Sequence, residues 1–292
     1  MSFIVVQILN GLTTAMFLFL IASGLSLIFG VLGVLNFAHG SLYMVGAYFV
    51  FTLLVILMKS PEYFWLAIIL APIAVATIGG AMERGLLRRL YRLEVLYQLL
   101  LTYAVILIAS DAVKGIWGAT NQAVPRPAVL AGSVDIMGHA FPSYNILVLA
   151  VGPLVLAGIW YVLHRTRWGR IVRAAASDRE MISALGVNVG RVFTTVFVFG
   201  ALLAGLGGAL VAAHRAIYPG MDFEIIVESF IVVVIGGLGS IAGTFLGAII
   251  IGQVNAFGIL WFSDYAIVFL YIIMAVVLIV RPWGLLGKPM AD

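Results

Sequence analysis

The chain has 292 residues, of which 64% are hydrophobic and only 10% are charged. A water-soluble domain carries about a quarter charged residues, so this composition excludes a soluble protein and indicates one that crosses a membrane several times. The formal net charge of +4 does not indicate nucleic-acid binding, because the cations lie in short loops between apolar runs. The absence of cysteine excludes disulfides, thiol catalysis and thiolate metal sites.

The apolar runs predict the membrane-spanning helices, because a helix that crosses the hydrocarbon needs roughly 20 residues. Runs near this length cover about 4–29, 41–58, 63–82, 94–112, 143–163, 193–213, 241–260 and 264–281. A shorter run at about 226–236 predicts a half-helix or short crossing that enters from the outer side. We therefore expect an all-α fold. It would be a single transmembrane domain over residues 1–292, a helical bundle of about eight or nine spans with broken or short segments.

The positions of lysine and arginine predict the orientation, because cytoplasmic loops carry an excess of positive charge. Three segments are rich in cations: Arg84, Arg88, Arg89 and Arg92; Arg165, Arg167, Arg170, Arg173, Arg179 and Arg191; Arg281 and Lys288. We expect these segments, including the C-terminal one, to be cytoplasmic. Returning Arg281 to the cytoplasm requires three crossings after residue 225. Nine spans with an external N-terminus meet this requirement, and eight spans with a re-entrant piece are the alternative.

The stretch Gly30-Val-Leu-Gly-Val-Leu-Asn-Phe-Ala-His-Gly40 interrupts two long apolar runs. A broken helix survives in hydrocarbon only where protein or a water-filled cavity satisfies its backbone, and such breaks mark transport pathways. Asn36 and His39 lie in this break. His39 would contact a solute or a proton or, as is commoner for a buried neutral histidine, bond a carbonyl within the bundle. On one helical face, the two side chains would cap the exposed backbone of the break.

A second cluster of small residues comprises Gly236, Gly237, Gly239 and Ser240. Four small residues in five loosen a helix, so we expect either a hinge or a break that lines the pore. The four-residue spacings of Gly200, Ala204 and Gly208, and of Gly243 and Gly247, instead predict close helix packing. Asp111, Glu228 and Asp264 are placed near span ends, from which their charges would reach the interface.

The cytoplasmic segment at about 169–191 contains a predicted short helix. Ser177, Asp178 and Glu180 belong to a Ser-x-x-Glu capping box, Met181, Ile182 and Leu185 follow on one face, and Gly186 supplies the stop. A helix this short is marginal in water, and its apolar face must therefore dock on something. One alternative is the membrane surface or the chain's own spans, and the other is a cytoplasmic partner. The external loop at about 113–142 is turn-rich, and would be either a contact for an external partner or a solvated connector.

The sequence contains no phosphate-binding loop, no hydrolase or zinc-protease motif and no calcium loop. We therefore expect no catalytic residues, no metal site and no cofactor in this chain. If ATP drives transport, the ATPase must be a separate subunit, which would give the cytoplasmic helix its purpose. A stand-alone secondary transporter or channel, an intramembrane enzyme and a purely structural subunit are the alternatives. The absence of a nucleophile–base pair argues against the enzyme.

Three blocks of sequence then resemble one family. They are Gly24-Leu-Ser-Leu-Ile-Phe-Gly-Val-Leu-Gly-Val-Leu-Asn-Phe-Ala-His-Gly-Ser-Leu-Tyr-Met-Val-Gly-Ala-Tyr48, Gly169-Arg-Ile-Val-Arg-Ala-Ala-Ala-Ser-Asp-Arg-Glu-Met-Ile-Ser-Ala-Leu-Gly-Val-Asn188 and Gly236-Gly-Leu-Gly-Ser-Ile-Ala-Gly-Thr244. In this order and spacing they resemble the LivH-type permease subunits of the high-affinity branched-chain amino-acid ABC transporters. The likeness covers essentially the whole chain.

The resemblance implies a non-catalytic permease subunit of a bacterial inner-membrane importer. Its partners would be a paralogous LivM-type permease, two ATP-binding cassette subunits that bind ATP and Mg²⁺, and a periplasmic solute-binding protein. Residues 177–186 would be the helix that couples to the ATPase, and Asn36 and His39 would lie near the translocation path. The family also includes permeases for urea, short amides and other small organic acids, so the resemblance does not fix the solute. The alternative function is a stand-alone secondary transporter or channel for a small solute such as urea or an amide.

Overall fold

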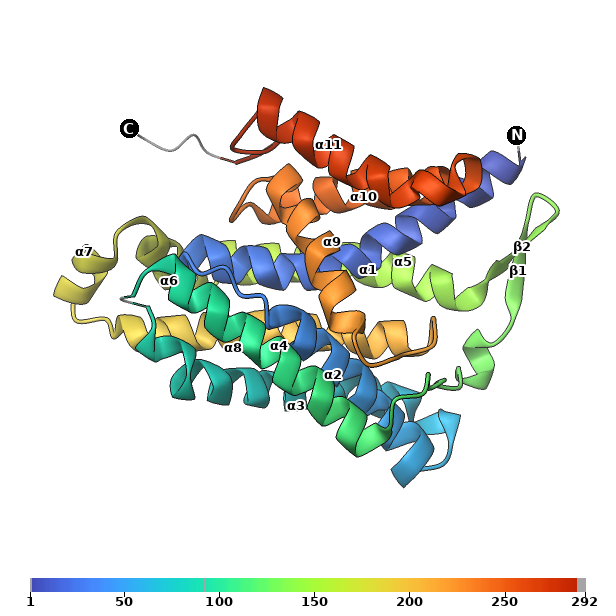
Figure 1. The fold of residues 1–292 in the computed structure, drawn as a ribbon, viewed down its shortest axis with the longest axis horizontal. Coiled ribbons are helices and arrows are strands. Elements are labelled where there is room, and N and C mark those ends of the chain that lie inside the picture. Colours follow the sequence, from blue (N-terminus) through green and yellow to red (C-terminus); the bar gives the residue numbers. More distant parts are fainter. Residues whose placement is uncertain (1, 92, 288–292) are drawn as a thin grey trace.

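A computed structural model describes residues 2–91 and 93–287. Most helices lie side by side along the long axis of the molecule, and one, α9, crosses them obliquely (Figure 1). Of the cations that predict the orientation, Arg92 and Lys288 lie outside the described residues.

The helices are α1 (Ser2–Leu32), α2 (His39–Phe51), α3 (Phe64–Gly85), α4 (Val95–Trp117), α5 (Ser143–Arg165), α6 (Arg167–Ser177), α7 (Arg179–Ala184), α8 (Val189–Ala212), α9 (Met221–Gly236), α10 (Ile241–Trp261) and α11 (Ala266–Val280). A π-helical segment, Thr52–Leu57, continues α2. Two short strands, β1 (Ser133–Ile136) and β2 (His139–Pro142), form an antiparallel hairpin in the external loop. The all-α prediction is confirmed, with this small hairpin in addition.

Within the described part of the chain, seven helical stretches are long and apolar enough to cross a membrane. They correspond to the first seven predicted runs. The eighth run, 264–281, gives the shorter apolar helix α11 (Ala266–Val280), because a 3-10 turn at Ser263–Tyr265 separates its start from α10. The short run at 226–236 is longer than predicted, since α9 already begins at Met221.

Contacts between distant residues establish which helix ends lie together. Gly239, just before α10, lies against Gly30 near the end of α1, and Gly237 lies against Gly287 after α11. At the opposite end of the bundle, the Gln7 amide donates to the Ala256 carbonyl, joining the start of α1 to the end of α10. The positions of these helix ends fit the nine-span alternative, with α9 as a short oblique helix, and the number of spans stays a prediction (Figure 1).

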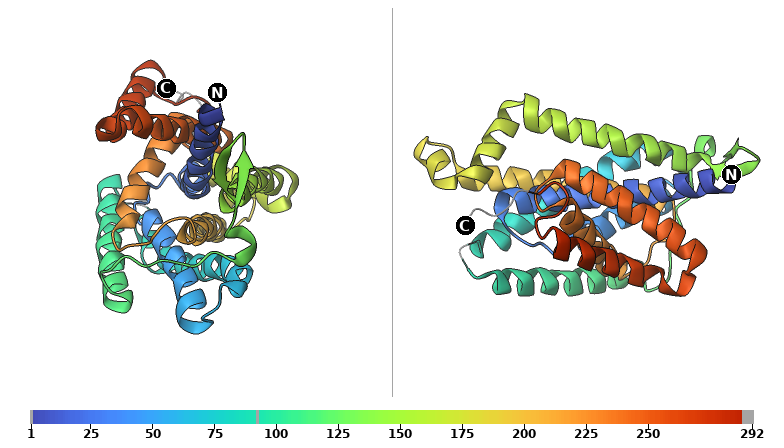
Figure 2. Two further views of the ribbon diagram at one scale, coloured as in Figure 1. Left: turned by 90° about the vertical axis from the view of Figure 1, so that its right-hand side faces the viewer. Right: turned by 90° about the horizontal axis from the view of Figure 1, so that it is seen from above.

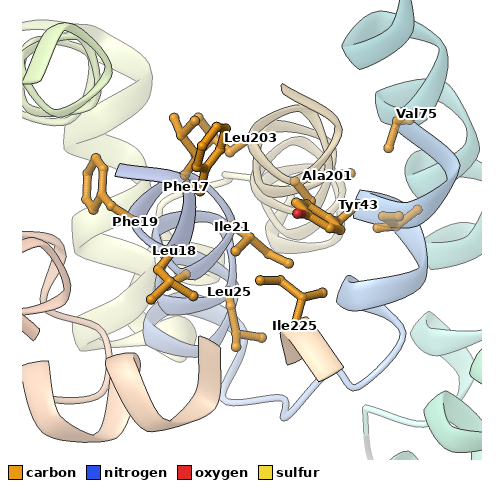
Figure 3. Packing of buried hydrophobic residues seen from close by; sticks show 14 of the residues in the cluster. Phe17, Leu18, Phe19, Ile21, Leu25, Tyr43, Val75, Ala201, Leu203 and Ile225 are labelled. Carbon is orange, nitrogen blue, oxygen red and sulfur yellow. The ribbon is translucent and has the colours of Figure 1, made fainter. Parts of the chain in front are cut away.

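Close packing of small residues joins the central helices. A Cβ added to Gly208 of α8 would lie 1.9 Å from the Tyr43 carbonyl oxygen of α2, and one added to Gly200 would lie 3.0 Å from the Gly24 carbonyl oxygen of α1. The predicted packing role of these glycines is confirmed. Figure 3 shows apolar side chains of α1, α2, α8 and α9 pointing toward one another: Ile21, Leu25, Tyr43, Ala201 and Ile225. Seen end-on, α9 lies between α4 and α11 (Figure 2).

Candidate functional site: two broken helices that meet inside the bundle

The first broken helix is formed by α1 and α2. After α1 ends at Leu32, Gly33 adopts a positive φ of 68°, and residues 33–38 turn back into the bundle without regular structure (Figure 1). α2 begins at His39, beside Ile21 of α1. Ile21 lies eleven residues before the end of α1, roughly 16 Å along the helix axis. α2 therefore begins deep within the bundle.

The second broken helix is formed by α8 and α9. After α8 ends at Ala212, residues 213–220 also turn back, and α9 begins at Met221 after Gly220, whose φ is 103° (Figure 1). The Ser41 hydroxyl of α2 donates to the Asp222 carboxylate of α9 over 2.9 Å. A Cβ on Gly40 would lie 2.3 Å from the Asp222 carbonyl oxygen, so only glycine allows this approach. The N-terminal ends of α2 and α9 therefore meet.

The two broken helices have opposite directions. α1 runs toward the end of the bundle that holds Gly239, α8 runs away from it, and each returns to the interior through an irregular segment. Inverted pairs of discontinuous helices build the solute sites of many transporters, with helix N-termini carrying partial positive charge at mid-depth. The meeting point of α2 and α9 is the candidate site for a translocated solute.

Four polar residues at this meeting point are buried: Asn36, His39, Ser41 and Asp222. The carbonyl oxygen of Ile21 can only accept, so His39 Nε2–H donates to it, over 3.1 Å. This hydrogen bond is the one expected if His39 has a structural role, namely a bond to a carbonyl within the bundle. Gly24 makes room for the ring, since a Cβ there would lie 2.9 Å from His39 Nε2.

Asn36 differs from its neighbours because neither atom of its amide has a hydrogen-bond partner among the described residues. It does not cap the break as predicted: Ala38 is the N-cap of α2, and no side chain caps that helix. Nearly all buried polar groups in proteins are paired, and an unpaired one costs about 1–3 kcal/mol. Asn36 therefore carries a free donor and a free acceptor at the candidate site.

The outer face of α9 is acidic. Glu224 and Glu228 lie one turn apart and, with Tyr271 of α11, help to line a hollow of about 340 Å³. The Tyr218 hydroxyl donates to Glu224. The prediction that Glu228 lies near a span end is wrong, because α9 begins at Met221 and places Glu228 in its middle. Charged side chains within spans face protein or water rather than lipid. The four-residue spacing of the two glutamates is the signal that sequence reasoning missed.

The glycine cluster does not join Asn36 and His39. Gly237 and Gly239 have φ values of 104° and 82°, and a Cβ on Gly239 would lie 2.9 Å from the Cα of Gly30. Gly30 lies nine residues along α1 from Ile21, or about 14 Å. Gly236 packs on Gly243, and Ser240 is the N-cap of α10, accepting from Gly243 N over 3.1 Å. These residues form a tight turn at the end of the bundle, and their place on a path stays a prediction.

The cap of the cytoplasmic helix is one residue later than predicted. Asp178 is the N-cap of α7, and its carboxylate accepts from Met181 N over 2.9 Å. Ser177 is the last residue of α6 and its hydroxyl donates to the Arg173 carbonyl over 3.2 Å. The prediction of a capping box that begins at Ser177 is therefore wrong. Asp178 has the extended backbone that an N-cap requires, whereas Ser177 is still helical. Glu180 lies in the first turn of α7.

The apolar face of α7 is divided. Ile182 is buried with 9% of its surface exposed, whereas Met181 and Leu185 are 58% and 72% exposed. Ile182 therefore docks on the bundle while Met181 and Leu185 remain uncovered in this chain. Gly186 ends the helix with a φ of 81°, as predicted. Docking on the chain's own spans therefore holds for Ile182, and docking of Met181 and Leu185 on a partner stays a prediction.

A buried carboxylate joins α3 to α8 near α7. Glu83 accepts from the Thr194 hydroxyl over 2.7 Å and from the Tyr91 hydroxyl over 2.9 Å. Burial and the adjacent Glu83 carboxylate raise the pKa of Tyr91, so its phenol stays protonated and keeps donating. Within the described ranges, no three histidine, aspartate or glutamate side chains gather as a metal site would require.

Comparison of the sequence with known proteins identifies the family of this chain. A model of the branched-chain amino acid transport system permease component matches residues 7–278. The chain belongs to this permease family. The permease is 33% identical to the BraD permease protein of Pseudomonas aeruginosa, over 97% of its length and 95% of the relative's.

Two further relatives are also permease proteins of high-affinity branched-chain amino acid transport systems. LivH of Salmonella typhimurium is 30% identical, over 97% of this permease and 95% of the relative. LivM of Escherichia coli is 26% identical, over 94% of this permease and 68% of the relative. No solved structure matches the permease.

Proposed function

We propose that this permease is the LivH-type membrane subunit of a bacterial inner-membrane ABC importer for branched-chain amino acids or similar amino acids. The observation that carries the proposal is the meeting of two inverted broken helices beside Asn36, whose buried amide has a free donor and acceptor. An amino acid offers both an ammonium donor and a carboxylate acceptor, so it complements such a group. The names of the relatives support this class of solute.

A paralogous LivM-type permease would cover the acidic face of α9. Glu224 and Glu228 line a hollow between α9 and α11, and carboxylates within a span require protein or water beside them. A second permease on this face would enclose the translocation path between the two subunits. The 26% identity to LivM, a longer relative, supports a partner of this kind.

Two separate ATPase subunits would bind ATP and Mg²⁺ and dock on the cytoplasmic segment at about 169–191. The exposed apolar side chains of Met181 and Leu185 suit such a contact. A periplasmic solute-binding protein would dock on the external loop, where Val129 and Met137 are 84% and 69% exposed. ATP binding would close the ATPase pair, displace α7 and turn the permease outward, and the docked protein would then release its solute into the path.

The experiment compares two substitutions that add the same charge at opposite ends. Leu185→Asp should abolish co-purification of the ATPase subunits in mild detergent, because a carboxylate would stand in an apolar contact. Val129→Asp should leave the ATPases bound but weaken stimulation of ATP hydrolysis by the solute-binding protein. Both side chains are exposed, so both variants should fold. Wild-type ATPase binding and uptake with Leu185→Asp would contradict the coupling role of α7.

The lone permease, reconstituted in vesicles without ATPases, distinguishes the stand-alone transporter. We expect no solute flux down a gradient, because the face of α9 would lack its partner. Flux of an amino acid, urea or an amide through the lone chain would contradict the proposed function.

A further inference from the structure

An arginine from the cytoplasmic segment holds the end of the first broken helix. Arg179, the first residue of α7, donates through Nη2 to the carbonyl oxygens of Leu32 and Val31, over 2.9 and 3.3 Å. Its guanidinium also lies over the Phe193 ring of α8, 5.1 Å from the ring centroid. The irregular segment 33–38 begins immediately after these two carbonyls.

An arginine from the external loop likewise binds the carbonyls at the end of the first half of the second broken helix, α8. Arg126 donates through Nε to the Ala213 carbonyl oxygen over 2.8 Å and through Nη2 to the His214 carbonyl oxygen over 3.1 Å. Gln122 and Ile217 exchange backbone hydrogen bonds of 2.8 and 2.9 Å, which tie the same loop to the irregular segment 213–220. The two arginines are thus equivalent in the inverted arrangement.

The chemistry of a helix end explains why arginine suits both places. The last carbonyls of a helix lack partners within the helix and carry partial negative charge. A guanidinium is always charged and donates from several nitrogens at fixed angles, so it binds two such carbonyls at once. When the segment that carries the arginine moves, the helix end must follow or the two hydrogen bonds must break.

We propose that Arg179 and Arg126 are positioning residues that pass movements of α7 and of the external loop to the two irregular segments beside Asn36 and Asp222. The proposal rests on the proposed function, because it takes ATPase binding at α7 and solute-binding-protein docking at the external loop as the sources of movement. Each arginine links one docking surface to one break. Arg179 acts on the segment that carries Asn36, and Arg126 acts on the segment that precedes Asp222.

Functional tests use Arg179→Gln and Arg126→Gln in the complete transporter. Arg89→Gln is the matched control, because Arg89 is an exposed cation outside the segment 169–191 and its side chain has no hydrogen bond to the described residues. With Arg179→Gln we expect solute transported per ATP hydrolysed to fall at least about tenfold, as when a coupling free energy is lost. With Arg126→Gln, basal hydrolysis should persist while its stimulation by the solute-binding protein is lost. Arg89→Gln should match the wild type.

A distance measurement separates coupling from a static cap. The chain contains no cysteine, so spin labels can be placed at single engineered cysteines. The pair Gly85→Cys/Ser183→Cys reports on α7, and Gly85→Cys/Leu35→Cys reports on the segment that carries Asn36. ATP should change both distances when Arg179 is present. In Arg179→Gln only the distance to position 183 should change. Arg179→Lys, which keeps one charged donor, should restore part of the change at position 35.

The outcomes separate the two proposals. If ATP still moves the label at position 35 in Arg179→Gln, the arginine is a static cap and the inference is overturned. If Arg179→Gln fails to assemble, Arg179→Lys decides, and a full wild-type movement at position 35 in that variant also overturns the inference. If neither distance responds to ATP in the wild type, and no ATPase co-purifies, the proposed function fails instead.

Discussion

At the scale of single residues, Asn36 is the residue of the candidate site whose side chain is left without any hydrogen bond among the described residues. Its side chain is fully buried, and within the described chain neither amide atom is paired. A protein selected only for stability would gain from an apolar residue there, because an unpaired buried amide costs about 1–3 kcal/mol. The other three polar residues of the site each make at least one hydrogen bond with their side chains: His39, Ser41 and Asp222.

Asn36→Leu tests this argument, since leucine has a similar volume and no polar atoms. We expect uptake by the assembled complex to fall by about tenfold or more, which corresponds to the loss of a hydrogen bond of about 1.5 kcal/mol. The thermal unfolding temperature in detergent should be unchanged or higher. Wild-type uptake in vesicles with a raised unfolding temperature would show that the amide has no part in transport.

The sequence pointed to Asn36 and His39 because both are polar residues beside glycines in an apolar run. It did not point to Ser41 or Asp222, since their contact joins positions far apart in the chain. The N-cap residue of α7 could not be predicted from the sequence either, because Ser177 and Asp178 are both good N-cap residues. Only the backbone, helical at one and extended at the other, distinguishes them.

At the scale of elements, glycine allows α2 and α8 to pack closely enough to hold the two broken helices together. The Tyr43 carbonyl oxygen occupies the place that a Cβ on Gly208 would need. Packing of this kind is the main source of helix association in lipid, where no hydrophobic effect draws helices together. The four-residue spacing of small residues predicted this contact correctly.

Gly208→Ala and Gly158→Ala form a matched pair that measures this contact. Gly208→Ala should destabilise the permease by about 1–3 kcal/mol, because the added methyl group would force α2 and α8 apart. Gly158 lies within α5 with no atom near the position of its missing Cβ, so Gly158→Ala should be neutral or stabilise the helix by up to about 1 kcal/mol. Unfolding in detergent gives the comparison, and equal stabilities of the two variants would refute the packing argument.

Helix lengths could be predicted from the apolar runs, but the breaks could not be traced fully. The run at 4–29 and the glycines after it indicated an interruption near residue 33. They did not reveal that residues 33–38 return into the bundle, because the return depends on contacts with residues far along the chain, such as that of Gly40 with Asp222. α9 was underestimated for a related reason: Asp222 and Glu224 lower the apolarity of its first turn, yet Asp222 is buried against Ser41.

At the scale of the whole molecule, the alternating helix directions place α7 and the hairpin β1–β2 at opposite ends (Figure 1). The distribution of arginine and lysine then predicts that α7 lies in the cytoplasm. The segment after α11 lies with Gly237 and Gly239, near the end of α1. This arrangement predicts a cytoplasmic end for α11 and an external position for the hairpin.

Labelling of single cysteines in whole cells checks this orientation. Met137→Cys, in the turn of the hairpin, should react with a membrane-impermeant maleimide added outside once the outer membrane is permeable. Ser183→Cys and Leu286→Cys should react only after the inner membrane is opened. All three side chains are exposed, so accessibility within the fold does not limit the reaction. Labelling of position 286 from outside would contradict the nine-pass arrangement.

The bond between Ser41 and Asp222 has a consequence for leakage. The bond joins α2 and α9, whose irregular segments enter the bundle from opposite ends. Neither helix can therefore tilt far without displacing the other. In the proposed transporter, this link would make the path close on one side as it opens on the other. The cell could then admit nutrients without letting its ion gradients run down.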